Sequence, residues 1–501
     1  MAGQSRGLDL KALGYLNYLH RVLSQPLGSW DGFYTPQSPS MNFALRYQLA
    51  FGAYAVAALA QRTPAYRAPY AEALRGAIEK MLDVASWGYW RVAKPERAEA
   101  GQASSSHVAV LLSPHASRLP AGPPSDPIVR DNLQYSGHLS SMLGLYEKLT
   151  GDATYDRPFT LHDPESGAAY TYTHGQVAAR IHEQMLENRF GGVCCETGIA
   201  YVPCNNHALT SNALHDALHG TSWALSNARW LRSVRSKMVL KGPALRGIFA
   251  VCYLKGVGAG APVAFNFTDA WGLAFLLPFD RSLVRKLYRK FKSRLTVEGP
   301  EVTYLSSSSL NEKMEISDVA INTGFALIVA RGMADEETAS RLESYAAREF
   351  GATWEGASYS YRGAPRTLHS TALYALAGAM TSGGEDFAAL FNAPADPAAS
   401  TQPYVAGVAA PFKVGISRAE YDPSLKTLDL AFRQVGEPAA LRNAPPTQVE
   451  ISLGNIDLRP QVTIDGAIID QDSYTHHGNG TLRLQIKVPS QQEATCKVAL
   501  S

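Results

Sequence analysis

The strongest constraint on the fold is a long succession of helical segments of two alternating kinds. Residues 40–61 are apolar nearly all round, as a helix covered on both faces is, whereas residues 69–90 begin with a proline and keep a polar face. Helical spacing also marks 10–23, 131–150, 174–189, 206–219, 223–237, 269–276, 280–293, 318–333, 335–348 and 368–392. This pattern of about twelve inner and outer helices predicts a mainly α fold, an (α/α)6 barrel with one central cavity.

Two stretches break the helical pattern. Residues 93–128 are rich in alanine, serine and proline, which predicts a long loop or lid. From about residue 401 the apolar residues recur with a period of two, as in "TLDLAFRQV" and "LRLQIKVP". We therefore expect a barrel domain over 1–395 and a small antiparallel, sandwich-like β-domain over 401–501.

Charge and composition exclude several classes of partner. The 46 basic and 44 acidic residues nearly cancel, so we expect neither nucleic acid nor an anionic membrane surface as a partner. No apolar run reaches the roughly eighteen residues of a membrane span, and the first residues do not resemble a signal peptide. Five cysteines form an odd set, which favours a reducing, cytoplasmic location over a disulfide framework.

Residues 191–221, "GGVCCETGIAYVPCNNHALTSNALHDALHGT", contain three of the five cysteines. Three explanations are open: a disulfide, a metal site, or a pair of thiols in acid–base chemistry. A bridge between Cys195 and Cys204 would close a short hairpin, but a reducing compartment disfavours it.

The metal explanation depends on "HDALH" at 215–219, which imitates the zinc motif HExxH. His215 and His219 are four residues apart, but Asp216 is one methylene shorter than glutamate and nothing fixes a third ligand. Surface or capping roles are the expected ones for these histidines. Cys204 and His207 offer another pair of ligands, again without partners, so the sequence predicts neither a metal nor a cofactor.

The acid–base explanation places Cys204 at or just before the start of a helix. The positive end of the helix dipole favours a thiolate there. Two thiols and an imidazole that face an apolar cavity can deliver one proton and remove another. The alternative is that the cysteines are inert packing.

Several segments carry a resemblance to a known family: "YLNYL" (15–19), "RYQLAFGAYAVA" (46–57), "SWGYW" (86–90), "DNLQYSGHLSSMLGLYEKLTG" (131–151), "VCCETGIAYVPCN" (193–205) and "LHGT" (218–221). Between about Gly14 and Arg331 the chain resembles the linalool dehydratase/isomerase family. The resemblance implies an (α/α)6 barrel that dehydrates and isomerises small isoprenoid alcohols without a cofactor.

The resemblance also implies roles for individual residues. Cys195 and Cys204 match the two catalytic cysteines of the family, His138 its active-site histidine, and Tyr47 a tyrosine of its pocket. The family's N-terminal Asp and Tyr, which act on the substrate hydroxyl, are replaced by His20 and Pro26, and a pocket tyrosine is replaced by Phe267. His20 is therefore a further catalytic candidate. The family builds its sites at subunit contacts, which implies a homo-oligomer here as well.

The predicted function is a cofactor-independent lyase, isomerase or cyclase that acts on a hydrophobic terpenoid or meroterpenoid substrate. A carbocation formed from an alcohol needs a dry site, and each aromatic ring stabilises such charge by about 0.5–2 kcal/mol. The expected catalytic residues are Cys195, Cys204, His138 and His20. The expected substrate-binding residues are Tyr47, Tyr135, Glu196, Tyr201, Phe267, Trp271 and Trp87.

Two alternatives remain open. A carbohydrate-active hydrolase or lyase on the same barrel would need two carboxylates about 5–10 Å apart. The available acids are Glu196, Asp269, Asp318 and Glu355. A non-catalytic ligand-binding protein would have its cysteines buried and apart. The ionisable side chains that converge in the barrel distinguish these classes.

Overall fold

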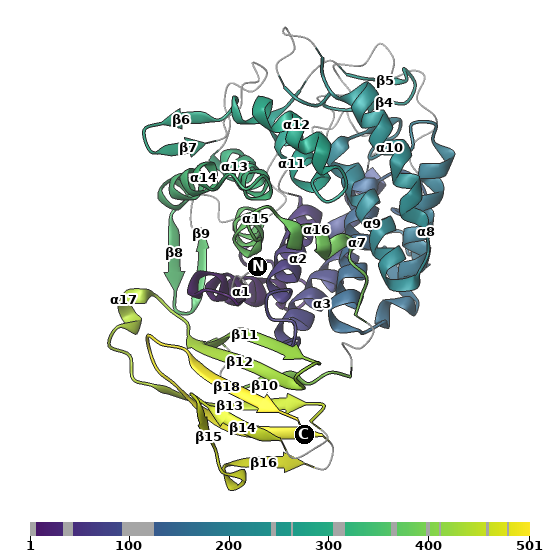
Figure 1. Cartoon of the computed structure of the whole chain (residues 1–501). Coiled ribbons are helices and arrows are strands. Elements are labelled where there is room, and N and C mark those ends of the chain that lie inside the picture. Colours follow the sequence, from purple (N-terminus) through teal and green to yellow (C-terminus); the bar gives the residue numbers. More distant parts are fainter. Residues whose placement is uncertain are drawn as a thin grey trace.

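The computed structural model describes 7–33, 44–92, 125–241, 247–261, 264–303, 316–361, 368–396, 401–409, 412–456, 460–477 and 480–500. Its helical part lies above a β-region formed by the last quarter of the chain (Figure 1). The lid predicted at 93–128 lies outside the described residues, apart from 125–128.

Six inner helices form a closed ring. They are α2 (Leu45–Ala60), α7 (Leu133–Thr150), α9 (Val202–His219), α11 (Asn266–Leu276), α13 (Ile316–Gly332) and α15 (Leu368–Ala379). Each packs against the next in this order, and α15 packs against α2. Every residue of α2 is buried, as its apolar sequence predicts, and its many alanines let neighbouring helices approach closely.

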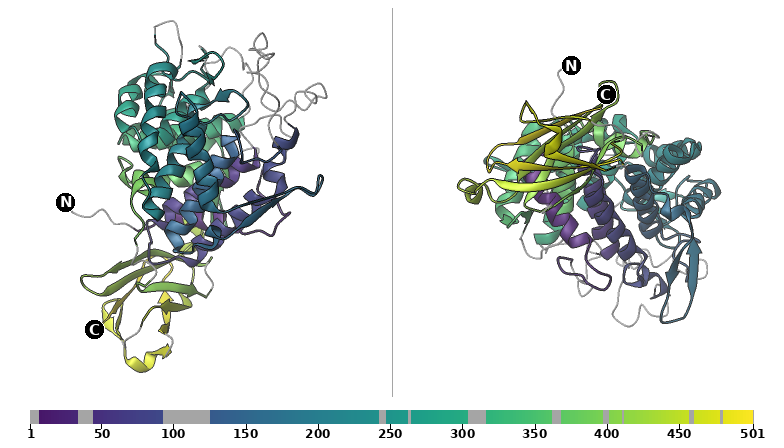
Figure 2. Two further views of the ribbon diagram at one scale, coloured as in Figure 1. Left: turned by 90° about the vertical axis from the view of Figure 1, so that its right-hand side faces the viewer. Right: turned by 90° about the horizontal axis from the view of Figure 1, so that it is seen from below.

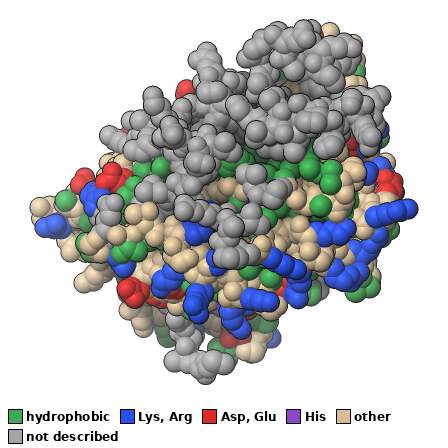
Figure 3. Space-filling view, turned by 90° about the horizontal axis from the view of Figure 1, so that it is seen from above, with side chains coloured by type: hydrophobic (Ala, Val, Ile, Leu, Met, Phe, Trp, Pro, Cys, Tyr) green, Lys and Arg blue, Asp and Glu red, His purple; other side chains and the backbone are tan. Residues whose placement is uncertain are grey.

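Outer helices cover this ring, and all but the largely buried α1 have an exposed polar face. They are α1 (Leu10–Leu23), α3 (Ala68–Leu82), α8 (His174–Glu187), α10 (Asn227–Ser233), α12 (Arg281–Lys292) and α14 (Glu336–Glu349). Side chains at the N-cap start several of them: Asp9 caps α1, Thr173 forms a capping box on α8, and Asp335 caps α14. Seen from above, many Lys and Arg side chains lie on the described surface (Figure 3).

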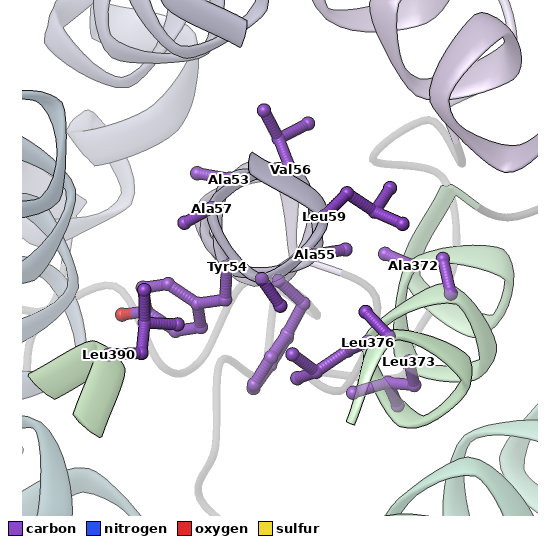
Figure 4. Close-up of a cluster of buried hydrophobic side chains, with 14 of the residues drawn as sticks. Ala53, Tyr54, Ala55, Val56, Ala57, Leu59, Ala372, Leu373, Leu376 and Leu390 are labelled. Atoms are coloured by element: carbon purple, nitrogen blue, oxygen red, sulfur yellow. The ribbon is translucent and has the colours of Figure 1, made fainter. Parts of the chain in front are cut away.

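Helix α16 (Glu385–Asn392) closes the inside of the ring at one end. The ring of Phe391 lies 6.1 Å from that of Tyr54, and Leu390 lies beside Tyr54 in the buried cluster of Figure 4. The sequence predicted one helix over 368–392, which is wrong. Gly383 and Gly384 have φ values of 92° and 65°, a left-handed backbone that turns the chain just before α16 begins.

Short elements connect the helices. Helical turns are α4 (Val84–Trp87), α5 (Tyr89–Val92), η4 (Thr154–Asp156), η5 (Trp223–Ser226) and η6 (Val234–Met238). Strands are β1 (Phe159–His162), β2 (Ala169–Tyr172), β3 (Ile199–Ala200), β4 (Tyr253–Leu254), β5 (Ala259–Gly260), β6 (Thr296–Glu298), β7 (Glu301–Thr303), β8 (Ala352–Glu355) and β9 (Ser358–Tyr361). All are antiparallel pairs or a three-stranded sheet at the ends of helices.

The C-terminal region contains two antiparallel sheets, ordered β10-β13-β17-β16 and β11-β12-β18-β14-β15. The strands are β10 (Tyr404–Val408), β11 (Val414–Asp422), β12 (Thr427–Gln434), β13 (Thr447–Gly454), β14 (Gln461–Ile464), β15 (Ala467–Ile468), β16 (Tyr474–His477), β17 (Thr481–Val488) and β18 (Ala494–Ala499), with the turns α17 (Pro438–Leu441) and η7 (Gln471–Ser473). Alternate residues of β17 are buried, as the period of two predicts. The prediction of a helical chain with an antiparallel C-terminal region is confirmed.

The β-region lies against the helical part (Figure 2), and backbone hydrogen bonds join the two. The amide of Val405 donates to the carbonyl of Ala65 at 2.7 Å, and that of Leu8 donates to Ser417 at 2.6 Å. The division into 1–395 and 401–501 as separate folding units stays a prediction. Across the part of the chain that the structure describes, no helix combines the length and the hydropathy needed to cross a membrane.

Two helical glycines give a matched test of this packing. A Cβ added at Gly76 of α3 would collide with the carbonyl of Leu23 and lie 3.0 Å from the Cα of Ser24, whereas one added at Gly378 of α15 meets only the Tyr15 ring, at 3.9 Å. We expect Gly76→Ala to lower the free energy of unfolding by about 1–3 kcal/mol, since helix backbones cannot give way. Gly378→Ala should raise it by about 0.5 kcal/mol through helix propensity. Equal denaturant midpoints for both variants would contradict this packing.

Candidate active site

The middle of the helix ring is filled by aromatic and imidazole rings. Helix α2 presents Tyr47, Phe51 and Tyr54 at positions i, i+4 and i+7, so all three lie on one face. The ring of Phe51 contacts rings from all the other inner helices. Its centroid distances are 5.6 Å to His138 of α7, 6.3 Å to His207 of α9, 5.4 Å to Trp271 of α11, 5.3 Å to Phe325 of α13 and 4.7 Å to His369 of α15.

A chain of hydrogen bonds runs through this cluster. The indole N–H of Trp271 donates to Nε2 of His207 at 3.3 Å, so the proton of neutral His207 is on Nδ1. That Nδ1 lies 3.3 Å from the hydroxyl of Tyr54, which in turn lies 2.8 Å from Nδ1 of His138. His207 therefore donates to Tyr54 and Tyr54 donates to His138, which leaves the proton of His138 on Nε2. This Nε2 is buried and has no hydrogen-bond partner among the described residues.

Both imidazoles are held neutral. Burial, and then the nearby His207, Arg46 and His369, lower the pKa of His138 well below its usual value. Burial lowers the pKa of His207 to about 3. The hydrogen-bond chain thus ends in a neutral N–H donor that has no partner among the described residues.

The thiols of Cys195 and Cys204 lie together where the chain enters α9. Cys204 is in the first turn of α9, just after Pro203, and Cys195 precedes β3, with its amide donating to Ile199 at 2.8 Å. Asn205 holds the connecting loop against the helix, because its side chain accepts from the amide of Val193 at 2.8 Å and donates to the carbonyl of Val193 at 3.0 Å. Both thiols are buried and free of disulfides.

Burial controls the protonation of Cys195. Burial, and then hydrogen bonding to Cys204 and its charge, raise the pKa of Cys195 well above the usual value, so Cys195 keeps its proton. Cys204 lies in the first turn of α9, at the positive end of the helix dipole, and interacts electrostatically with Arg46. Within this pair Cys195 is therefore a proton donor.

Tyr47 connects the thiol pair to the aromatic cluster. Its ring lies 5.5 Å from His138 and 5.2 Å from Trp271. Burial is the main cause that raises its pKa, and the charges of Cys204 and Cys195 add to the rise. Arg46 lies over the Tyr47 ring at 4.6 Å, and both side chains donate to Oε1 of Gln134, at 3.3 Å from Arg46 and 3.1 Å from Tyr47.

The structure brings most of the predicted site residues together. Cys195, Cys204, His138, Tyr47 and Trp271 belong to this one buried cluster. Tyr201 and Glu196 lie beside it: burial raises the pKa of Tyr201, with smaller contributions from Glu196, Cys252 and both site thiols.

Four predicted residues lie elsewhere, each with its own partner. His20 is 3.1 Å from the carboxylate of Glu72, and its ring lies 5.3 Å from that of Phe412. Trp87 and Tyr135 donate to backbone carbonyls, those of Leu82 and Met81, both at 3.0 Å. Phe267 stacks on Phe265 at 5.9 Å. No hydrogen bond or ring contact among the described residues joins any of the four to the thiols or to His138.

Some residues of the cluster were not predicted. Tyr54, Phe51, His207, Phe325, His369, Arg46, Gln134 and Tyr89 all contribute, the last with Arg46 stacked over its ring at 3.9 Å. Helical spacing carries a signal for several of them: His207 is three residues after Cys204, and Gln134 is four before His138. A helical-wheel projection of α7 and α9 from His138 and Cys204 would have found Gln134 and His207.

Among the candidate acids whose side chains the structure describes, Asp269 and Glu355 are each engaged with an arginine. Asp269 is buried in a salt bridge with Arg294 and accepts from the amides of Ile248 and Phe249. Glu355 lies on the β8–β9 hairpin, 3.9 Å from Arg21. The side chain of Asp318 lies outside the described residues. Of these acids, Glu196 is the one beside the thiols.

Comparison with known proteins gives a family match, and distant solved structures are also similar. A model of the linalool dehydratase/isomerase family (Ldi) matches residues 46–367. A GH127 β-L-arabinofuranosidase from Geobacillus stearothermophilus T6 aligns over 97% of this chain and 76% of its own, at 13% identity and a TM-score of 0.28. The GH127 β-arabinofuranosidase BT3674 aligns over 99% and 77%, at 8% identity and a TM-score of 0.25. Scores this low do not establish a shared fold.

The buried imidazole of His207 predicts a pH dependence of stability. Between pH 6.5 and about 3 the unfolded chain binds a proton at this site and the folded chain does not, so the free energy of unfolding falls as pH falls. His207→Gln removes this proton uptake and keeps a donor and an acceptor. We expect the free energy of unfolding of the variant to fall less steeply as the pH falls. Its slope should differ from that of the wild type by up to about 1.4 kcal/mol per pH unit.

Urea unfolding at several pH values between about 5 and 7 measures this slope. His162→Gln, a change at an exposed histidine of β1, is the control and should keep the wild-type slope. Identical slopes for wild type and His207→Gln would show that His207 is not held neutral.

Proposed function

Because the chain belongs to the linalool dehydratase/isomerase family, we propose that it dehydrates or isomerises a hydrophobic, isoprenoid-like alcohol by acid–base chemistry of its own side chains. The observation that carries the proposal is the pair of buried, hydrogen-bonded thiols at the start of α9, beside the aromatic cluster. We further infer that the ring of inner helices with its outer helices is an (α/α)6 barrel.

Cys195 is the acid in this proposal, since burial and Cys204 keep its proton in place. Its S–H protonates the substrate hydroxyl. The C–O bond then breaks, water departs, and an allylic carbocation remains. Cys204 as thiolate removes a proton from the carbon next to the cation, which forms the new double bond. The proton then passes from Cys204 to Cys195, which restores the starting state.

Isomerisation shares the first half of this path. Water adds to the other end of the allylic cation, and the Cys195 thiolate removes the extra proton from the new hydroxyl. The two outcomes differ only in whether the cation loses a C–H proton or gains water. Substrate shape and access of water would decide between them.

The aromatic cluster suits a cationic intermediate. Trp271, Phe325 and Phe51 present rings to one another in the middle of the helix ring, and each face that meets the substrate stabilises the cation by about 0.5–2 kcal/mol. Neutral His138 and His207 add no positive charge that would oppose it. In this proposal the Nε2–H of His138 binds the substrate oxygen.

This arrangement accounts for the altered N-terminal segment. The positions of the family's Asp and Tyr are His20, which contacts Glu72 and Phe412, and Pro26, whose carbonyl accepts from Lys80 at 2.7 Å. Neither contacts the thiols in the described structure. The thiol of Cys195 and the imidazole of His138 therefore take over the substrate hydroxyl in our proposal.

The two alternatives are less well supported. A glycan-cleaving enzyme needs two opposed carboxylates, and among the described acids only Glu196 adjoins the thiols. A binding protein with inert cysteines does not require two thiols that share a hydrogen bond. The convergence of Cys195, Cys204 and His138 favours catalysis.

The thiol variants test the proposal, with linalool as the first substrate probe. Cys195→Ser and Cys204→Ser should each lower turnover by about 10²–10⁴-fold, because a serine hydroxyl holds its proton at any physiological pH. Gas chromatography–mass spectrometry of the dehydrated and isomerised products gives the turnover, and the melting temperature reports on folding.

Cys194→Ser is the matched control. Cys194 is the adjacent buried thiol, and burial followed by the charge of Asp131 raises its pKa to about 12. It should lose stability like the other two but keep its turnover. Full turnover in both Cys195→Ser and Cys204→Ser would remove the thiols from the mechanism.

A further inference from the structure

Four side chains with metal-ligand chemistry converge at the far ends of α7 and α9. They are Glu147 of α7, Asp156 of η4, His174 at the start of α8 and His219 at the end of α9, here called the His174 cluster. One ligand atom from each lies within 4.8 Å of all the others. Nε2 of His219 and Nδ1 of His174 lie 3.9 Å and 3.7 Å from the same carboxylate oxygen of Glu147.

His174 gives an independent indication of a ligand. Its side chain is 1% exposed, and neither ring nitrogen has a hydrogen-bond partner among the described residues. A buried imidazole without partners costs about 1–3 kcal/mol in the folded state. The ring is held in this position because Gly144 of α7 leaves room for it; a Cβ there would lie 3.3 Å from Cε1 of His174.

We propose that the His174 cluster binds a divalent transition metal, with Zn²⁺ as the best match. Two imidazole nitrogens and two carboxylate oxygens are a suitable tetrahedral set for Zn²⁺. Bonds of about 2.1 Å put tetrahedral ligands about 3.4 Å apart, so separations of 3.7 and 3.9 Å need only small rotations of the side chains. The metal would satisfy one of the two unpartnered nitrogens of His174.

The surrounding charges favour a cation here. α7 and α9 both end at the cluster, and the C-terminal end of a helix carries partial negative charge. The neighbouring cation, Lys148, does not neutralise the carboxylates, because its ammonium donates to the carbonyls of Ala389 and Leu390 at 3.0 Å and 2.8 Å. His215, the other close imidazole, lies 4.6 Å from His219.

The motif "HDALH" takes part through one histidine only. His215 stacks on Trp223 at 3.8 Å and its Nδ1 lies 2.9 Å from the hydroxyl of Thr221. Asp216 accepts from the amides of Trp223 and Ala224 and so starts η5. The partners of His219 come from α7, η4 and α8, which no local motif joins.

The proposed metal has a structural role, separate from the thiol site. Glu147 is nine residues after His138, about 14 Å along α7, and His219 is fifteen residues after Cys204, about 22 Å along α9. A metal would join the ends of two inner helices to the start of an outer helix. This metal site goes beyond the proposed catalytic function and does not depend on that function.

Zinc titration of the full-length, tag-free chain tests the proposal after a chelator has removed bound metal. Isothermal titration calorimetry should detect one Zn²⁺ per chain, and a hundredfold excess over Kd should raise the melting temperature by about 3 °C. Asp156→Asn and His219→Asn, changes at exposed residues, should each weaken binding by at least about tenfold, as should His174→Asn.

Two controls separate this site from others. His162→Asn alters an exposed histidine outside the cluster and should leave zinc binding unchanged. The double variant Cys195→Ser/Cys204→Ser should also bind one Zn²⁺ with wild-type affinity. No binding by the wild-type chain, or binding that the double variant loses and Asp156→Asn keeps, would overturn the proposal.

Discussion

The ring of Phe51 is the contact on which the rest of the helical part depends. It touches a ring from each of the other five inner helices, so the packing that closes the helix ring also positions His138, Trp271 and His369. A large buried ring with neighbours on all sides has no room to shift without loss of packing. The scaffold and the candidate site are therefore fixed by the same interaction.

The second constraint is that the polar groups near Phe51 are buried and hydrogen-bond to one another. The chain from Trp271 through His207 and Tyr54 to His138 runs in one direction, because the indole can only donate. A chain that starts at an obligatory donor leaves a donor at its other end. The unpartnered Nε2–H of His138 follows from that direction.

Much of this arrangement could be predicted from the sequence, and the reasons for the failures are physical. Apolar helices such as 40–61 identify the inner ring, and the thiols at 195 and 204 stand out in a chain with few cysteines. His20 was assigned by its position in a family pattern, but its place depends on Phe412, 392 residues further on. No local pattern contains such a contact.

The prediction of one helix over 368–392 failed for a different reason. Its apolar residues continue through both α15 and α16, and only the Gly383–Gly384 pair marks the turn. α16 has apolar residues because it fills the end of the ring, where Phe391 packs near Tyr54. The apolar pattern therefore reports that this segment is buried but does not show that the chain turns between two helices.

The ends of α7 and α9 give the two proposed sites a common electrostatic cause. Tyr47, His138 and Cys204 lie within the first two turns of α2, α7 and α9, so these neighbouring helices begin on the same side of the ring. Parallel dipoles then add instead of cancelling. One end of the ring favours negative charge, where Cys204 lies, and the other favours positive charge, where Glu147 and His219 gather. The common direction of α2, α7 and α9 thus gives the two proposed sites opposite electrostatic environments.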